Sequence, residues 1–356
     1  MLLIASYSSR KIVNELKELP TVAIPLRYAP FISTFSYVLC LLAYLPYLML
    51  RFKPDFVVVE PNPTVISLIP LFMFPRRTRP KVILDIRSTP VNIVGVGGYL
   101  KTTFFSVSLR IAKELFQGIT IITSFMKTEV CNRFGVAPNL VGVWTSGVST
   151  TAFNSESRDK IKIRKALGLE DKFVVFYHGA LGGKRGIAET IKAVDLLRSR
   201  CPNLVLFLLG NTSTGGARVL RDMIRELNIR NMVILHESVA YSEVPRFVCM
   251  CDVGIVPLLD QPDWRYQCPL NLLEYLSMKK VAIVTDIPAN REILKENKCG
   301  IFARSADPQG ISDAILYAYI NRDSLKEWGA YGRNVVEQRY TWAKVAQEFE
   351  TYLLKL

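Results

Sequence analysis

The sequence is poor in the residues that build zinc sites and disulfide frameworks. Its 356 residues include two histidines, and none of its seven cysteines forms a Cys-x-x-Cys pair. The nearest pair, Cys249 and Cys251, fits two core-facing positions better than a metal site. Structural zinc needs clustered Cys and His, and disulfide frameworks belong to oxidising compartments. We therefore expect reduced thiols, no metal and a cytoplasmic protein.

The sequence also lacks a recognisable leader and a clean membrane span. Its apolar start, residues 1–6, is too short for a signal peptide and fits a strand. Residues 28–50 form a run of 23 without charge, flanked by basic residues and long enough to cross a bilayer. However, Pro46 disfavours a span, and an apolar segment bordered by cations is typical of a membrane-docking face. We expect a buried or interfacial helix, and a peripheral protein on the inner face of the cell membrane.

Acidic residues are scarce in the first half of the chain. The net charge is +14, and residues 1–150 carry 16 Lys and Arg against seven Asp and Glu. A basic, apolar half favours an anionic partner such as lipid headgroups or phosphates. Clustered base-stacking motifs are missing, so we expect an anionic membrane surface and no nucleic acid.

The length and the alternation of apolar runs predict two domains. A chain of 356 residues is too long for one ordinary core. In both halves, short β-rich runs alternate with helical stretches, as in doubly wound parallel sheets covered on both faces. The predicted fold class is therefore α/β, with two Rossmann-like domains in series. We place them at residues 1–152 and 153–356, because the stretch 152–159 is polar and small.

The strands are predicted from continuous apolar runs bounded by polar or glycine residues. In the first domain they are Leu2–Ser6, Thr21–Leu26, Phe56–Pro61, Val82–Ile86, Ile119–Thr123 and Leu140–Trp144. In the second they are Phe173–His178, Leu204–Leu209, Val233–Leu235, Val253–Val256, Ala282–Val284 and Gly300–Phe302. The tail 324–356 is helical by its apolar spacing, and Gly95, Gly97 and Gly98 predict a flexible loop.

A phosphate-binding loop is indicated after the first strand of the second domain. This loop contains three glycines and two cations, namely Gly179, Gly182, Gly183, Lys184 and Arg185. Glycines let a backbone approach a ligand closely, and the N-terminal amides of the next helix point into the same space. The pattern predicts a diphosphate site, with a surface turn carrying solvated cations as the alternative.

A lone acid stands among apolar residues in the segment Cys268–Ser277. A proline opens a short helix there, and Glu274 lies on its second turn, as a ligand contact or a helix-surface acid. The segment resembles the nucleotide-sugar signature of the retaining glycosyltransferases of family 4, which have the GT-B fold. This resemblance implies that Glu274 holds the donor ribose. It also implies that the backbone amides of Leu270, Asn271 and Leu272 face the diphosphate.

The resemblance extends over roughly residues 144–356. Gly210 and Asn211 match the turn beside the nucleotide, and Val239 belongs to the segment that holds the base. The GT-B fold implies two Rossmann-like domains facing across a cleft, with a C-terminal helix that crosses back to the first domain.

Several positions depart from the family pattern. Arg185 replaces the usual lysine at the diphosphate, and Ala180 replaces an arginine. Tyr266 stands where the family has an acid that contacts the donor sugar, and the first domain lacks the usual Gly-Gly loop. These departures keep two alternatives open: a catalytically degenerate GT-B protein that binds sugar nucleotides or lipids, and a GT-B epimerase.

A second group of polar residues follows the predicted strand Val82–Ile86 in the first domain. Asp85, Arg87, Ser88 and Thr89 offer an acid, a base and two hydroxyls, which makes them candidates for the acceptor side, with Asp85 as a catalytic group. A buried Asp85–Arg87 pair or a solvated turn is the alternative.

The resemblance implies an activity as well as a fold. It implies a metal-independent, retaining transfer of a hexosyl unit from a nucleotide-diphosphate sugar to a lipid-linked or cell-envelope glycan, with no cofactor. Arg185 and Lys184 would stabilise the leaving group. Glu274 and Asp85 are two further catalytic candidates. The sequence has no Asp-x-Asp motif.

Overall fold

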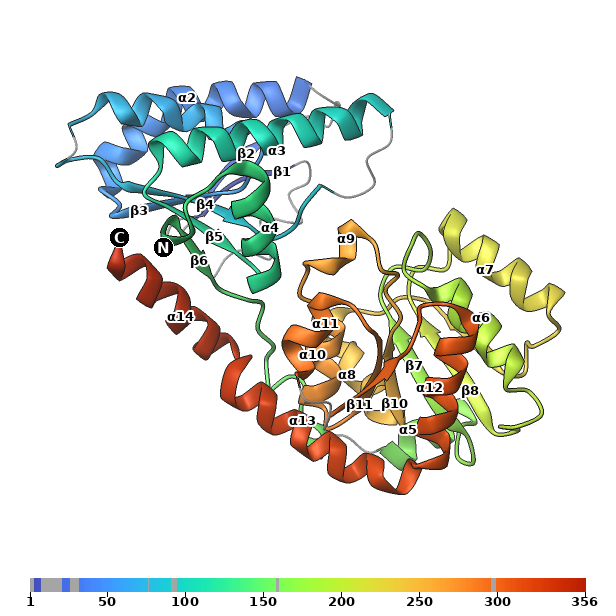
Figure 1. Cartoon of the computed structure of the whole chain (residues 1–356). Helices are drawn as coiled ribbons and strands as arrows, with labels where there is room; N and C mark the ends of the chain where they lie inside the picture. Colours follow the sequence, from blue (N-terminus) through green and yellow to red (C-terminus); the bar gives the residue numbers. More distant parts are fainter. Residues whose placement is uncertain are drawn as a thin grey trace. The chain divides into compact units, whose positions relative to one another are not determined.

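The computed structural model describes most of the chain as two compact units (Figure 1). The described residues are 3–7, 21–25, 32–75, 77–90, 95–157, 160–295 and 299–356. The first unit contains Met1–Ile121, Lys127–Val143 and Tyr352–Leu356, and the second contains Ile122–Met126 and Trp144–Thr351. Each unit has its own parallel sheet, as the alternation of apolar runs predicts.

The sheet of the first unit has four parallel strands in the order β3-β4-β5-β6. Their bounds are Phe56–Val59, Lys81–Ile86, Gly118–Ile121 and Val141–Val143. β1 (Leu3–Tyr7) and β2 (Thr21–Pro25) form a separate parallel pair. All six predicted strands of this half are therefore confirmed to within a few residues. In β4, every residue after Lys81 is buried, which explains the unbroken apolar run in the sequence.

Three helical segments of the first unit lie side by side (Figure 1). They are α2 (Ile32–Phe52), the 3-10 helix η1 (Pro63–Met73) and α3 (Gly95–Leu115). The predicted loop at Gly95, Gly97 and Gly98 is wrong, because these residues form the first turn of α3. Glycine costs a helix only about 1 kcal/mol per residue, which the packing of a long helix offsets.

Helix α2 covers most of the uncharged segment 28–50 that the sequence singles out. Residues 28–31 of that segment lie outside the described residues. Its part Thr34–Phe52 is long and apolar enough to cross a membrane, and 17% of its most apolar window is buried. Leu41, Leu45 and Leu48 form the buried stripe, with the spacing of one helix face.

The last helix, α14 (Trp342–Lys355), ends in the first unit. The Tyr352 hydroxyl donates to the carbonyl of Leu140 at 2.7 Å and accepts from the amide of Ile119 at 3.2 Å. Gly142 makes room for the tyrosine ring, because a Cβ at that position would lie 2.4 Å from it. The chain therefore returns to the first sheet at its C-terminus, as predicted.

The second unit has a six-stranded parallel sheet in the order β12-β11-β10-β7-β8-β9. The strands, from β7 to β12, are Phe173–His178, Leu204–Leu209, Val233–His236, Val253–Val256, Val281–Thr285 and Gly300–Ala303. All six predicted strands are confirmed. Helices α6 and α12 pack together, and α10 packs against α8 and α13 (Figure 1).

The remaining helices have the following bounds. They are α4 Ser124–Phe134, α5 Lys160–Leu167, α6 Ile187–Leu196, α7 Gly215–Glu226, α8 Val244–Met250, α9 Pro262–Arg265, α10 Leu270–Ser277, α11 Pro288–Leu294, α12 Pro308–Ile320 and α13 Leu325–Arg339. Short 3-10 turns cover Pro138–Leu140, Ser155–Ser157, Tyr241–Glu243 and Arg322–Ser324.

Candidate functional site

The strand order of the second sheet reverses at β7, which lies between β10 and β8. From β7 the chain adds β8 and β9 on one side, and then β10, β11 and β12 on the other. Loops that leave the two strands flanking such a reversal diverge, so ligands of open α/β sheets bind there. The glycine loop leaves β7 and the segment with Trp264 follows β10, so both lie at this reversal, and Trp264 contacts Lys184 there.

The glycine loop has the backbone that its sequence predicts. Gly179, Gly182, Gly183 and Gly186 all have φ between 65° and 135°, a region that other residues rarely adopt. A Cβ on Gly182 would lie 2.8 Å from the Cα of Gly216, in the first turn of α7. The loop therefore packs tightly against α7 on one side. At Gly183, by contrast, a Cβ would meet nothing within 4 Å, so this part of the loop is open.

Trp264 closes over the two cations that follow the glycines. Its indole Nε1 donates to the backbone carbonyl of Lys184 at 2.8 Å. Its ring lies under the guanidinium of Arg185, whose Cζ is 4.5 Å from the ring centroid. The Lys184 side chain is exposed, whereas Arg185 is half-buried. Arg185 is thus a held cation and Lys184 a solvated one.

Tyr177 supports Arg185 from within the sheet. Burial raises the pKa of the Tyr177 hydroxyl, and the positive charge of Arg185 opposes that rise. The hydroxyl donates to the carbonyl of Ala180 at 3.1 Å, inside the glycine loop. The positive charge next to Tyr177 comes from Arg185.

Glu274 is buried, with 3% of its surface exposed, so it is not a helix-surface acid. Its Oε1 accepts from the Tyr241 hydroxyl at 2.8 Å. Its Oε2 lies 3.0 Å from His178 Nε2, but the geometry is not that of a hydrogen bond, and both atoms lack a hydrogen-bond partner among the described residues. Loss of solvent and the Glu274 charge raise the pKa of Tyr241. Since His178 directly precedes Gly179, the structure brings Glu274 to the glycine loop.

The first turn of α10 offers fewer amides than the sequence predicts. The Leu272 amide already donates to the carbonyl of Pro269 and to Oδ1 of Asn271, both at 3.1 Å. Leu272 itself is a core residue, whereas Leu270 is half-exposed. The Leu272 amide is thus already engaged in the helix turn, which leaves the amides of Leu270 and Asn271 as the better candidates of the three.

The other predicted donor residues differ in how closely they approach this cluster. Gly210 touches it, because a Cβ there would lie 2.2 Å from the carbonyl oxygen of Gly179. Asn211 uses its side chain within its own loop, where Oδ1 accepts from the Ser213 amide at 2.9 Å. Val239 is half-buried. The backbone carbonyl of Tyr266 accepts from the Thr123 hydroxyl at 2.7 Å.

Glu237, which was not predicted as a site residue, joins the loops that follow β8 and β9. Its carboxylate accepts from the hydroxyl of Thr212 and, at 2.8 Å, from that of Ser238. Hydrogen bonds, first from Thr212 and then from Ser238, lower the pKa of Glu237 to about 2. The carboxylate therefore stays charged at neutral pH and orders the carboxyl edge of the sheet.

The acceptor-side candidates belong to the first unit. Asp85 lies inside β4, is buried, and accepts from the hydroxyl of Thr120, its partner on β5, at 2.8 Å. Arg87 and Thr89 are half-buried, and Ser88 is exposed. The strand pairing and the hydrogen bond to Thr120 give Asp85 a structural role. Among the described residues, no group of three or more His, Cys, Asp and Glu is placed to hold a metal ion.

Solved structures with the same architecture come from glycosyltransferases. A glycosyltransferase from Rickettsia africae superposes with a TM-score of 0.79 and 13% identity over 99% of this chain and 90% of its own. Anabaena HepE, solved in complex with UDP, also reaches 0.79, with 15% identity over all of both chains. The chain has the GT-B fold.

Comparisons of the amino-acid sequence also match glycosyltransferases. The family model described as glycosyl transferases group 1 matches residues 159–335, within the second unit. A GDP-mannose-dependent alpha-(1-6)-phosphatidylinositol monomannoside mannosyltransferase of Mycobacterium tuberculosis is 23% identical over 239 residues, 66% of this chain and 61% of that protein. The matched part thus spans about three fifths of that relative. These findings support a GT-B glycosyltransferase over the degenerate protein and the epimerase.

Proposed function

We propose that this GT-B chain is a retaining, metal-independent glycosyltransferase that takes a hexosyl unit from a nucleotide-diphosphate sugar. The observation that carries the proposal is the cluster at the β7–β10 switch point. There, an open glycine loop and a cation held by Trp264 lie together with a buried carboxylate oxygen that faces His178 Nε2 at 3.0 Å and has no hydrogen-bond partner among the described residues. The neighbour HepE, solved with UDP and with UDP-glucose, supports a nucleotide-sugar donor.

Each residue of the cluster has a distinct task in the proposed reaction. The amide of Gly183 and the guanidinium of Arg185 bind the diphosphate and neutralise the charge that develops as it leaves. Glu274 Oε2 accepts from a ribose hydroxyl, which would satisfy the buried oxygen. Asp85, Arg87, Ser88 and Thr89 are proposed for the acceptor side, and no protein nucleophile or cofactor is involved.

The proposed acceptor is a lipid-linked or cell-envelope glycan. The mycobacterial relative acts on a phosphatidylinositol monomannoside, by its name, which supports a lipid-linked acceptor. WaaG, another solved GT-B neighbour with a TM-score of 0.70, is described as involved in lipopolysaccharide biosynthesis. Both names concern glycolipids, which supports the proposed class of acceptor.

Calorimetric titration with UDP-glucose and GDP-mannose tests the donor part of the proposal. One of them should bind the wild type, and Glu274→Gln should weaken that binding roughly tenfold, because a hydrogen bond to a charged acceptor is worth about 1.5–3 kcal/mol. The fold should be kept, since an amide oxygen can still accept from Tyr241. Unchanged affinity in the variant would remove Glu274 from the site.

Trp264 should act on donor binding through Arg185. Trp264→Phe keeps a ring under the guanidinium but loses the bond to Lys184, so it should cost about 1 kcal/mol of donor binding. Trp264→Leu loses both contacts and should cost about 2 kcal/mol. Calorimetry measures both, and Trp342→Phe, in a half-exposed tryptophan of α14, is the matched control. Equal affinity in all three variants would contradict the role of Trp264.

We further propose that the protein works in the cytoplasm, docked on the inner face of the cell membrane through α2 and η1. Large apolar side chains are exposed on both, including Phe35, Tyr47 and Leu50 on α2 and Met73 on η1, which is 87% exposed. Arg51 and Lys53 follow at the end of α2. Exposed apolar side chains next to cations match a surface that enters anionic headgroups.

Vesicle flotation tests this docking. The protein should float with phosphatidylglycerol vesicles at low salt and be released by high salt, because charge attraction is screened within about 10 Å at 0.1 M. Leu50→Glu should abolish flotation, and Leu354→Glu, at a similarly exposed leucine of α14, should not. A span would instead resist both salt and alkaline carbonate. A protein that never floats at low salt would contradict the docking.

A further inference from the structure

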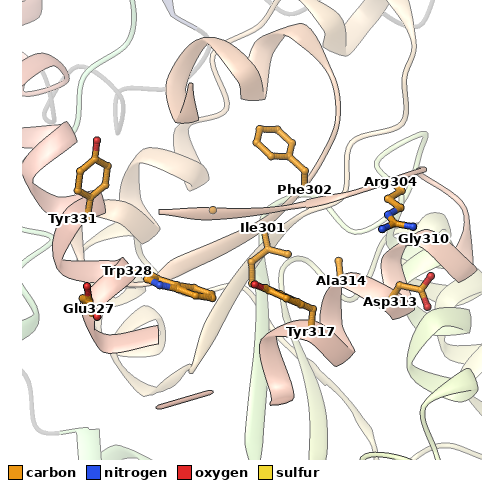
Figure 2. Close-up of a pocket in the computed structure, with 11 residues that line it drawn as sticks. Ile301, Phe302, Arg304, Gly310, Asp313, Ala314, Tyr317, Glu327, Trp328 and Tyr331 are labelled. Atoms are coloured by element: carbon orange, nitrogen blue, oxygen red, sulfur yellow. The ribbon is translucent and has the colours of Figure 1, made fainter. Parts of the chain in front are cut away.

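A large open cavity lies in the second unit on the outer edge of its sheet, away from the switch point. It has a volume of about 930 Å³ and is bounded by β12, α12 and α13 (Figure 2). β12 is the last strand on its side of the sheet, whereas the glycine loop leaves the central strand β7. The cavity is therefore separate from the proposed donor site, and it falls in the usual size range of ligand pockets, about 300–1,000 Å³.

Aromatic rings form the floor of this cavity. Tyr317 of α12 and Trp328 of α13 lie nearly parallel, with an angle of 12° between their planes and 6.1 Å between their centroids (Figure 2). Tyr317 is 50% exposed, and Tyr331, one turn after Trp328, is also exposed. Two helices thus present flat apolar surface to solvent at one place, although soluble proteins seldom leave such surface uncovered without a function.

Charged groups with free hydrogen-bonding capacity surround the floor. The side chains of Arg304 and Glu327 form no ion pair or hydrogen bond with any residue that the structure describes. Among the described residues, the Asp313 carboxylate accepts only from the side-chain amide of Gln309, one turn earlier on α12, at 2.9 Å. The cavity therefore holds two carboxylates and one guanidinium, all of which are planar groups that can bind two hydroxyls side by side.

We propose that this cavity binds a neutral oligosaccharide segment. A pyranose ring has an apolar C–H face that stacks on aromatic rings and a rim of hydroxyls for carboxylate and guanidinium groups. Two carboxylates against one arginine disfavour a phosphate or a nucleotide. Nearly parallel rings also give a floor and not a cage around a cation. The ligand class rests on the proposed function, because an enzyme that extends a glycan works in the presence of oligosaccharide chains.

Saturation-transfer NMR and calorimetry on the full chain test the proposal with mannotetraose, cellotetraose and N-acetylchitotetraose as probes. At least one should bind, with transfer strongest to its ring C–H protons. Tyr317→Ala should weaken that binding roughly tenfold, as expected for one lost stacking ring. Asp313→Asn should weaken it as well. Ile320→Ala is the matched control, because Ile320 is exposed on the same helix but does not line the cavity.

Titration of UDP-glucose and GDP-mannose into the same samples keeps the two proposals apart. Nucleotide-sugar binding should be equal in the wild type and in Tyr317→Ala, since Tyr317 lies outside the donor site. If none of the three oligosaccharides binds, the cavity proposal is overturned, whatever the nucleotide sugars do. It is also overturned if one binds with equal affinity to Tyr317→Ala, or if an extended peptide displaces it by pairing with β12.

Discussion

Replacing Arg185 by alanine should lower kcat/KM for sugar transfer by roughly 10²- to 10³-fold, or about 2.7–4 kcal/mol of transition-state stabilisation. The guanidinium is held over Trp264, at 4.5 Å from the ring centroid, next to the open side of the glycine loop. A cation fixed in this way needs no rearrangement when negative charge develops on the leaving diphosphate. Initial rates of nucleoside diphosphate release with the best donor measure the effect.

Lys184→Ala is the matched control for this experiment. Lys184 is the adjacent residue and has the same charge, but its side chain is exposed and therefore screened by solvent and salt. Its loss should cost less than about tenfold. Equal small losses at the two positions would mean that both cations are solvated and that the loop does not clamp a leaving group.

Replacing Gly186 by alanine should lower the free energy of unfolding by at least about 3 kcal/mol. Gly186 caps α6 with φ of 72°, and a Cβ there would lie 1.7 Å from the carbonyl oxygen of Pro257, at the end of β10. The methyl group would therefore force apart the two loops that form the switch point. Urea unfolding followed by circular dichroism measures the loss.

Gly183→Ala separates this clash from backbone strain. Gly183 has a similar φ of 65°, but a Cβ there meets nothing within 4 Å. Its substitution should therefore cost only the left-handed conformation, about 1–2 kcal/mol. Equal losses in the two variants would show that Pro257 and Gly186 are not in tight contact.

The strands could be predicted because a buried parallel strand is a continuous apolar run. β7, β8 and β10 have the predicted bounds, and each ends where a glycine, proline or other turn residue follows. The glycine loop could also be predicted, since its glycines occupy backbone conformations that few other residues reach. The two cations that follow the glycines also predicted that Arg185 lies just before the start of α6.

The contacts that complete the site could not be predicted, because they join distant parts of the sequence. Trp264 lies 80 residues from Lys184, and Tyr241 lies 33 residues from Glu274. Only the strand order, which places β10 beside β7, brings the first pair together. A tryptophan in the segment 260–267, which is mostly polar, was the signal available for Trp264. For Leu272, the sequence predicted the helix but not the hydrogen bonds that its backbone amide makes to Pro269 and Asn271.

A crystal structure with UDP or GDP bound tests the central claim most directly, since it locates the diphosphate. The account predicts phosphate oxygens within hydrogen-bond reach of the Gly183 amide and the Arg185 guanidinium, with the ribose near Glu274. Trp264 should keep its contact with Arg185 in the complex. A nucleotide bound elsewhere on the chain, or one whose diphosphate faces away from Arg185, would contradict the account.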